Sequence, residues 1–301
     1  AALKSACPDA EVTLIARSYC SALLYKSPAI DTVLFVDETT GGVTELIQNG
    51  RYDAIFFPRP QFEEYFAAFR ARIPLRVGSG YRWYSFLIKH KQFDHRKTAE
   101  FHEAEYNTRL VGSVLEEPVE TRLVRPIVIP ESKHSTNKLL NSNGITSAQR
   151  IIVIHPGSGG SSHDWQPENF GKLSELLSKQ LRMPVIITGV ENEKERCQIV
   201  QKYCPAAINL CGKLSLADMI ALLDTSSLLV ANSTGVLHIA AALGIPVVGL
   251  YPRSPAISSG RWGPYSQNSI VVSPPDQPEF QDDMNLISVE SVADACLSFF
   301  K

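Results

Sequence analysis

The chain has 301 residues, of which 44% are hydrophobic and 20% charged, and its formal net charge is −2. This length suits two domains of roughly 100 to 200 residues each. No apolar run approaches the ~20 residues of a membrane-spanning helix, so we predict no transmembrane segment.

Short β-branched runs alternate with helical patterns in the first half, and we predict strands at 11–16, 32–36 and 54–57. Such strands, separated by helices, imply parallel sheets covered on both faces. Residues 1–10 read as the tail of a helix and a turn, although a doubly wound domain normally starts with a strand. We therefore expect the first strand of this domain to be missing, and we favour truncation ahead of Ala1.

A cationic segment follows between Arg70 and Lys97. It holds eight Lys or Arg residues against one acid, Asp94, which is a local net charge of about +7. A solvated surface is the commoner explanation for such a cluster. The functional alternative is an anionic partner such as a phosphorylated lipid, a sugar or a membrane surface.

The pattern weakens between 116 and 150, where Pro126, Pro130 and a polar Ser-Lys-His-Ser-Thr-Asn run occur. We place the link between domains at about 117–145. The expected organisation is a Rossmann-like first domain at 1–145, a second at 146–285 and a C-terminal helix at 286–301.

The second half continues the alternation, with strands predicted at 151–155, 184–188, 228–231 and 246–251 and a last one near Val272. The fold class is therefore α/β. All six cysteines are expected to be free thiols in a reducing cytoplasm, because there is no C-x-x-C pair.

A glycine- and serine-rich loop, His155-Pro-Gly-Ser-Gly-Gly-Ser-Ser162, follows the first of these strands. Glycines let backbone N–H groups approach a ligand, and hydroxyls add donors, so the composition suits an anionic group. A merely flexible loop is equally compatible, because the stretch matches neither common phosphate-loop motif.

A second such loop is Asn232-Ser-Thr-Gly235, between the strand at 228–231 and a helix that ends at Gly244. The helix N-terminus carries unpaired N–H groups and about half a positive charge, so Ser233, Thr234 and Gly235 lie where a phosphate is held. His238, one turn further, could donate to the same anion. Simple helix capping by Ser and Thr is the alternative. Both loops leave the carboxyl edge of a parallel sheet, so they are expected to face one ligand.

Two further loops offer weaker candidates. Acidic residues in 189–195 suit the first turn of a helix, although one of them could accept from ribose hydroxyls. Leu214, in the loop after residue 211, is either a core residue or an apolar wall for a base.

These motifs together resemble glycosyltransferase family 9, the heptosyltransferases of lipopolysaccharide core assembly. The first half resembles it more loosely, through Arg76-Val-Gly78 and 102–107. The motifs of the second half are H-P-G-S-G at 155–159, H-D-W-Q-P at 163–167, T-G-V-E-N-E at 188–193, K-L-S-L at 213–216, N-S-T-G-V-L-H-I-A-A-A-L-G at 232–244 and R-W-G-P at 261–264.

The resemblance implies a GT-B fold, in which two Rossmann-like domains with parallel sheets face each other across a cleft. The donor nucleotide sugar binds the second domain and the acceptor binds the first. Glu193 matches the acid that holds the ribose, and Leu214 lies against adenine. The implied contacts of the diphosphate are Ser233, Thr234, Gly235 and His238, with Ser158 and Gly159 opposite.

Three departures from the family pattern stand out. His163 occupies a position where the family usually has Lys, and Ser233 replaces a common Asp, so donor identity or affinity is expected to differ. The general base of the family lies in a Gly-Asp loop that would precede residue 1. The catalytic residue therefore stays unknown.

The function implied is inverting, metal-independent transfer of a sugar, with heptose favoured, from an ADP-linked or other nucleotide-diphosphate donor to a lipopolysaccharide core acceptor. No cofactor, metal or nucleic-acid partner is expected. Acceptor-side candidates are Arg59, Arg76 and Arg82, and the expected location is the cytoplasm, with peripheral contact at the inner membrane. The alternatives are a transferase for another nucleotide sugar and a non-catalytic GT-B module that binds a nucleotide or glycan.

Overall fold

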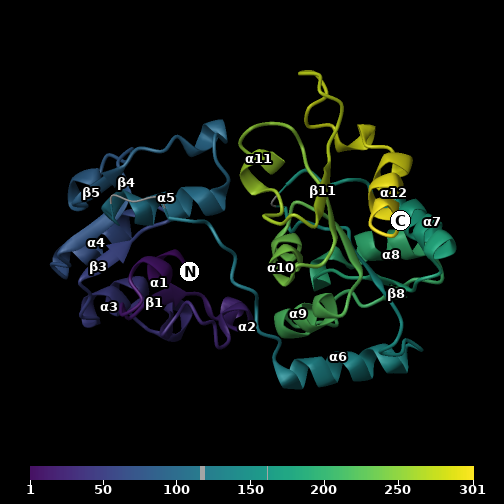
Figure 1. The fold of residues 1–301 in the computed structure, drawn as a ribbon, viewed down its shortest axis with the longest axis horizontal. Helices are drawn as coiled ribbons and strands as arrows, with labels where there is room; N and C mark the ends of the chain where they lie inside the picture. Colours follow the sequence, from purple (N-terminus) through teal and green to yellow (C-terminus); the bar gives the residue numbers. More distant parts are fainter. Residues whose placement is uncertain (116–118, 161) are drawn as a thin grey trace. The chain divides into compact units, whose positions relative to one another are not determined.

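The structure is a computed structural model that describes residues 1–115, 119–160 and 162–301. It divides into two compact units, Ala1–Val124 and Arg125–Lys301, which are the purple-to-blue and teal-to-yellow parts of Figure 1. No helix among the described residues is long and apolar enough to span a bilayer.

The first unit contains five parallel strands among its described residues, arranged in two sheets. One sheet pairs β1 with β2, and the other has the order β3-β4-β5. Its strands are β1 (Thr13–Ala16), β2 (Thr32–Phe35), β3 (Ala54–Phe56), β4 (Leu75–Ser79) and β5 (His90–Gln92), and its α-helices are α1 (Ala2–Ala6), α2 (Ser21–Leu24), α3 (Gly42–Asn49), α4 (Phe62–Arg70) and α5 (Glu103–Leu115).

The three strands predicted for this unit are present within a few residues, whereas β4 and β5 were not predicted. β4 carries Arg76 and Gly78 and β5 is His-Lys-Gln, so neither shows an apolar run. The residue at 78 must be small, because a Cβ there would lie 2.3 Å from the Tyr65 hydroxyl oxygen. Whether a strand is missing ahead of Ala1 stays a prediction.

Helix α4 places its two faces in different environments. Tyr65, Ala67 and Ala68 are buried against the core formed with α3 and the loop after β4. Phe62, Phe66 and Phe69 lie on the opposite face and are exposed.

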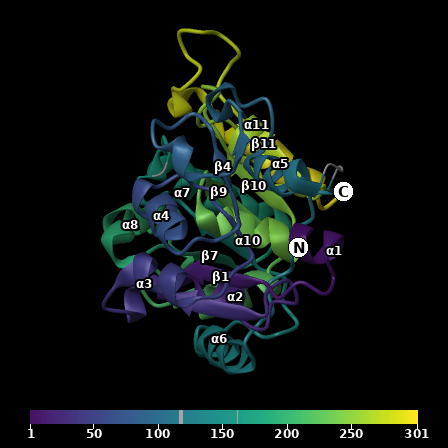
Figure 2. The same cartoon turned by 90° about the vertical axis from the view of Figure 1, so that its left-hand side faces the viewer.

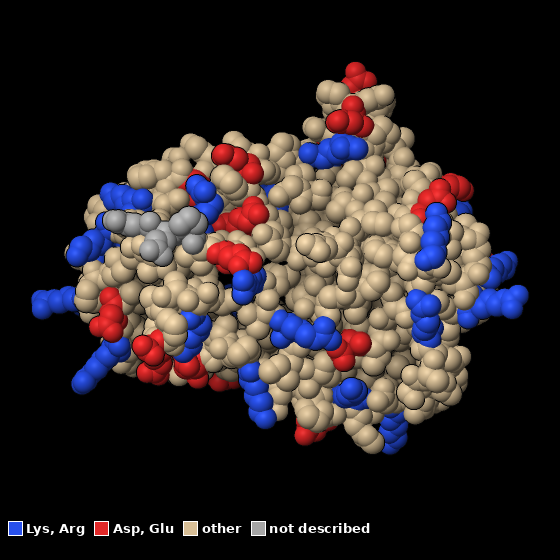
Figure 3. All heavy atoms as spheres, in the orientation of Figure 1, with Lys and Arg blue, Asp and Glu red and all other residues tan. Residues whose placement is uncertain are grey.

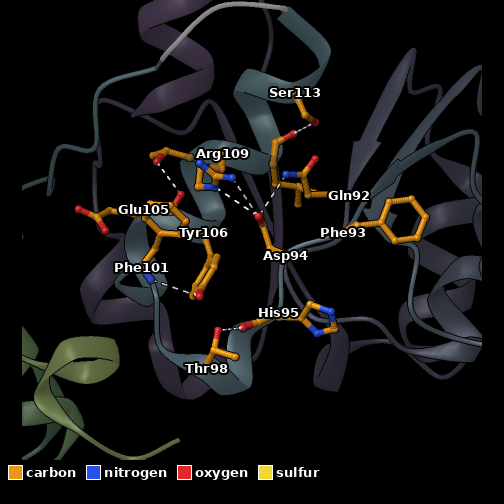
Figure 4. Close-up of polar contacts among 12 residues, drawn as sticks. Gln92, Phe93, Asp94, His95, Thr98, Phe101, Glu105, Tyr106, Arg109 and Ser113 are labelled. Carbon is orange, nitrogen blue, oxygen red and sulfur yellow. Dashed lines mark hydrogen bonds and ion pairs between the residues drawn. The ribbon is translucent and has the colours of Figure 1, made fainter. Parts of the chain in front are cut away.

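Asp94 connects the segment after β5 to α5, as Figure 4 shows. Its Oδ1 accepts from Arg109 at 3.1 Å, and its Oδ2 accepts from Gln92 at 3.1 Å. Arg96 in turn pairs with Glu103. Asp94, the single acid of the cationic segment, therefore pairs with side chains of the first unit itself, and Arg96 does the same.

The second unit contains one six-stranded parallel sheet of order β11-β10-β9-β6-β7-β8. The first strand along the chain, β6, lies in the middle, with later strands added on both sides. The strands are β6 (Ile152–His155), β7 (Val185–Ile187), β8 (Ile208–Asn209), β9 (Leu228–Asn232), β10 (Val247–Leu250) and β11 (Ser269–Val272). The four strands predicted with bounds here and the one predicted near Val272 are all found; β8 was not predicted.

Helices cover both faces of this sheet (Figures 1 and 2). One face packs against α7 (Pro167–Leu181), α8 (Lys194–Tyr203) and α12 (Val289–Ser298), which bury Phe170, Val200 and Val292 with alternate strand residues. Helix α10 (Gly235–Leu243) contacts β9 and β10 and packs against α9 (Leu216–Asp224). A short helix, α11 (Ser259–Trp262), follows β10.

Residues 130–142, which we predicted to be part of a linker, form helix α6 (Pro130–Ser142). Pro130 occupies the first turn, where its missing N–H costs nothing. The helix packs on α9, where Ser135 donates to Asp218 at 2.7 Å. The division between the two units falls after Val124 and not at 145, so α6 belongs to the second unit. The composition of α6 is polar because only two of its residues, Thr136 and Leu140, are buried.

Candidate functional site

The candidate site lies at the carboxyl edge of the second unit's sheet, where β6 and β9 are neighbours. Strands β7 and β8 lie on one side of β6, and β9, β10 and β11 lie on the other. The direction in which strands are added therefore reverses between β6 and β9. Ligands of open parallel sheets bind at such a reversal. The loops after β6 and β9 border this point, as the sequence predicted.

Asn232, the last residue of β9, fastens these two loops together. Its side chain is fully buried, its Oδ1 accepts from the Trp165 N–H at 3.0 Å, and its Nδ2 donates to the Pro156 carbonyl at 2.7 Å. Trp165 is itself buried and donates from Nε1 to the Ile287 carbonyl at 2.9 Å. Both ends of the loop after β6 are therefore held by one amide side chain.

The glycine-rich loop has a backbone that only glycine adopts without strain. Gly159 and Gly160 have φ of +59° and +79°, and a Cβ on either would meet no atom within 4 Å. The requirement is therefore conformational and not steric. The space on the Cβ side of both residues is open, and a ligand-binding role for Gly159 stays a prediction.

Glu193 connects the loop after β7 to the glycine-rich loop. Its Oε1 accepts from the Gly159 N–H at 3.1 Å, and its Oε2 accepts from the Val190 N–H at 2.9 Å. A Cβ at Gly157 would lie 1.9 Å from Oε1, so this close approach needs glycine. The structure thus brings into contact two residues that we predicted to bind the donor nucleotide sugar, Gly159 and Glu193. A carboxylate offers about four acceptor positions, so Glu193 retains capacity for a hydroxyl.

A pocket of about 470 Å³ opens beside this contact, between the glycine-rich loop and the N-termini of α7 and α8. It is lined by Gly159, Gly160, Asp164, Gln166, Pro167, Glu168, Asn192, Glu193, Glu195, Arg196 and Ile199. Leu214 is half-buried in the loop after β8, outside these lining residues. It is therefore not a core residue.

The N-terminus of α10 begins directly after the loop that follows β9. Thr234 is the N-cap, with extended φ and ψ of −150° and 161°, and its side chain makes no cap hydrogen bond. Gly235 is exposed, and a Cβ on it would meet nothing within 4 Å. The first N–H groups of a helix lack intrahelical partners. Thr234 does not satisfy them by side-chain capping, which was the alternative explanation for that residue. His238 lies half-buried one turn on.

Ser233 belongs to a hydrogen-bonded chain that reaches the R-W-G-P motif. Its hydroxyl hydrogen-bonds to that of the buried Tyr251, which donates to the Trp262 carbonyl at 2.7 Å. Burial raises the pKa of Tyr251 well above its ordinary value, so the phenol stays protonated. Tyr251 was not among the predicted site residues, since it reads as the end of an apolar strand.

A half-buried carboxyl group, Asp164, lines the pocket together with Gly159 and Gly160 of the glycine-rich loop. Its Oδ2 pairs with Arg196 at 3.2 Å, whereas its Oδ1 is buried without a hydrogen-bond partner among the described residues. Burial raises the pKa of Asp164, and hydrogen bonding from Ser158 and the charge of Arg196 oppose that rise. His163, the position where a Lys was expected, is exposed next to this carboxyl.

His155 ends β6 beneath the same loop. It is buried, and its Nδ1 lies 3.0 Å from the Thr188 hydroxyl. Burial lowers the pKa of His155, and the nearby charge of Glu193 opposes this only in part. His155 therefore supports the loop as a neutral side chain.

The three acceptor-side candidates lie in the first unit and differ in their surroundings. Arg59 and Arg82 are exposed. Arg76 is half-buried; its Nε donates to the Leu87 carbonyl at 2.8 Å, and its guanidinium lies 5.7 Å from the centre of the Phe69 ring. Arg76 therefore also packs the fold, and an acceptor role for all three stays a prediction.

Residues 43–287 match the sequence model of glycosyltransferase family 9 (heptosyltransferase). The chain belongs to this family. Among its relatives, lipooligosaccharide heptosyltransferase 2 of Haemophilus ducreyi is 25% identical over 300 residues, covering 90% of this chain and 82% of the relative.

Two solved family 9 structures have the same fold. A family 9 glycosyltransferase from Veillonella parvula superposes with a TM-score of 0.87 at 19% identity, covering 99% of this chain and 90% of that one. The Escherichia coli ADP-heptose LPS heptosyltransferase II gives 0.78 at 20% identity, covering 99% and 92%. The predicted GT-B class, with parallel sheets in an α/β fold, is confirmed, and family 9 membership makes the chain a glycosyltransferase.

Proposed function

We propose that this family 9 glycosyltransferase transfers a heptose from an ADP-linked donor to a lipopolysaccharide core acceptor. One relative is named for heptosyl transfer in lipooligosaccharide and one structural neighbour for ADP-heptose. The observation that carries the proposal is the joining, by Asn232 and Glu193, of three loops around the N-terminus of α10.

In the proposed complex the diphosphate lies against Ser233, Thr234, Gly235 and His238, with Ser158 and Gly159 on the other side. The support is local: Gly235 is exposed, a Cβ on either Gly235 or Gly159 would meet nothing within 4 Å, and the α10 dipole adds about half a positive charge. Glu193 is proposed to accept from a ribose hydroxyl, and the half-buried Leu214 to contact the adenine.

The proposed reaction is a single displacement. An acceptor hydroxyl oxygen forms a bond to the anomeric carbon while that carbon's bond to the diphosphate breaks on the opposite face, which inverts the configuration. The hydroxyl proton leaves to a base, and negative charge grows on the diphosphate oxygens. Preorganised N–H donors stabilise that charge more in the transition state than in the ground state, so the proposal does not call on a metal ion.

The acceptor is proposed to bind the first unit, where Arg59 and Arg82 offer exposed positive charge to its phosphates. Because the lipopolysaccharide core is built on a lipid, the proposed place of action is the cytoplasmic face of the inner membrane, with peripheral contact.

Calorimetric titration with ADP, UDP and GDP tests the donor assignment. We expect ADP to bind most tightly, and a preference for UDP or GDP would favour a transferase for another nucleotide sugar. If none of the three nucleotides bound measurably, the proposed donor site would be overturned. His163→Lys serves as a matched variant: if His163 approaches the diphosphate, restoring a fixed charge tightens ADP binding.

A further inference from the structure

An exposed cluster of aromatic rings and arginines covers the outer side of α4 and the adjoining loop after β4. Its rings are Phe62, Phe66, Phe69 and Trp83, and its arginines are the exposed Arg70, Arg72 and Arg82 with the half-buried Arg76. We call this set the aromatic–arginine face.

The rings of this face contact one another and leave much of their surface in solvent. Phe62 stacks on Phe66 at 5.8 Å and on Trp83 at 5.5 Å between ring centres. Trp83 is nevertheless 76% exposed, and the three phenylalanines of α4 are between 41% and 48% exposed. Large aromatic groups gathered on one side of a fold in this way mark an interaction surface.

Positive charge surrounds these rings. Arg70 lies 6.0 Å from the centre of the Phe66 ring and Arg76 5.7 Å from that of Phe69. Phe69, Arg70, Arg72 and Arg76 line a pocket of about 540 Å³. Blue side chains project along the left-hand edge of Figure 3, where α4 and β5 lie in Figure 1.

The acids near this face do not cancel its charge. Residues 59–91 contain seven Lys or Arg and two acids, Glu63 and Glu64, which leaves five net positive charges. Glu63 accepts from Thr44 at 3.0 Å. Burial raises the pKa of Glu64, with Arg59 opposing the rise.

We propose that the aromatic–arginine face docks on an anionic bilayer surface, with the rings at headgroup level and the arginine-lined pocket on a lipid phosphate. Aromatic rings flanked by Arg and Lys favour the boundary between headgroups and acyl chains. Anionic lipids attract such cations, at roughly a fivefold gain in affinity for each charge near the surface. The inference rests on the proposed function, because a lipid-linked acceptor places the transfer at a bilayer.

Vesicle co-sedimentation of the full chain tests this inference. Vesicles of phosphatidylethanolamine with phosphatidylglycerol should bind the protein, and phosphatidylcholine vesicles should bind it at least about 25-fold more weakly, which is what two surface charges contribute. Trp83→Ser with Phe66→Ser should reduce binding to the anionic vesicles by about tenfold. Arg70→Gln with Arg72→Gln, made separately, should reduce it by about 25-fold.

Matched controls keep the test specific. Tyr19→Ser removes an equally exposed ring, 72% exposed and outside this face, and Lys133→Gln with Lys138→Gln removes two exposed charges on α6; both should leave vesicle binding unchanged. ADP affinity and the thermal midpoint should stay at wild-type values throughout, which separates failure of this inference from failure of the donor site.

Equal binding to both vesicle types, or anionic binding that the face variants do not weaken, would overturn the proposal. Self-association that these substitutions abolish, without vesicle binding, would also overturn it and assign the face to a second copy of the chain.

Discussion

Replacing Gly235 by proline removes one backbone N–H from the proposed phosphate site while sparing the helix that presents it. Gly235 is the first residue of α10, where proline is well tolerated. Thr234 already has the extended backbone that a residue before proline prefers. The structure leaves open space at the Gly235 Cβ position, so neither the fold nor the helix opposes the change.

The expected effect is large for binding and small for stability. A hydrogen bond to a charged group contributes about 2 kcal/mol, which corresponds to roughly a 30-fold rise in the Kd for ADP. The thermal midpoint should stay close to wild type, because the lost N–H has no partner within the helix. Turnover should fall together with binding, since the same donor faces the growing charge on the diphosphate.

Calorimetry with ADP on Gly235→Pro and Gly235→Ala separates the effect of losing the N–H donor from the effect of adding side-chain atoms. The alanine variant keeps the N–H and adds only a methyl group, so the ratio of the two Kd values isolates the donor. A proline variant that is folded and binds ADP as the alanine variant does would refute the proposed role of this N–H.

Three further outcomes follow from the contacts around the site. Asn232→Ala leaves the buried Trp165 N–H and Pro156 carbonyl without their hydrogen-bond partner. Denaturant titration should show that the free energy of unfolding falls by about 2–4 kcal/mol, and an unchanged value would contradict the role of Asn232 in joining the two loops. Because burial lowers the pKa of His155 in the folded state, the native state binds fewer protons than the unfolded one. Stability should therefore fall as pH drops below about 6.5, and His155→Gln should remove that slope in urea titrations across this range. Glu193→Gln replaces one of two accepting oxygens by a donor, so ADP affinity should fall about tenfold with the fold retained, and wild-type affinity would exclude Glu193 from the site.

Much of the second unit could be predicted because its strands are buried on both faces. Residues 152–154 and 228–231 are continuous apolar runs followed by polar residues, so their parallel pairing and the position of the loops follow from the pattern. The polar strand β5 and helix α6 could not be predicted, because their burial depends on neighbours that are distant in sequence.

The contacts that organise the candidate site were also beyond sequence reasoning. Asn232 stood out as a polar residue at the end of an apolar strand, but its two partners are in another loop. Glu193 was assigned to a ribose, whereas the structure shows that it first holds Gly159 in place. Ser233 was singled out as a departure from the family, and its link to Tyr251 is visible only once β9 and β10 are neighbours.

A crystal structure of the chain with ADP tests the central proposal most directly. The account predicts diphosphate oxygens within about 2.7–3.2 Å of the Gly235 backbone nitrogen, with the ribose at Glu193. A diphosphate bound away from residues 233–238, with α10 presenting its N-terminus to solvent alone, would contradict it.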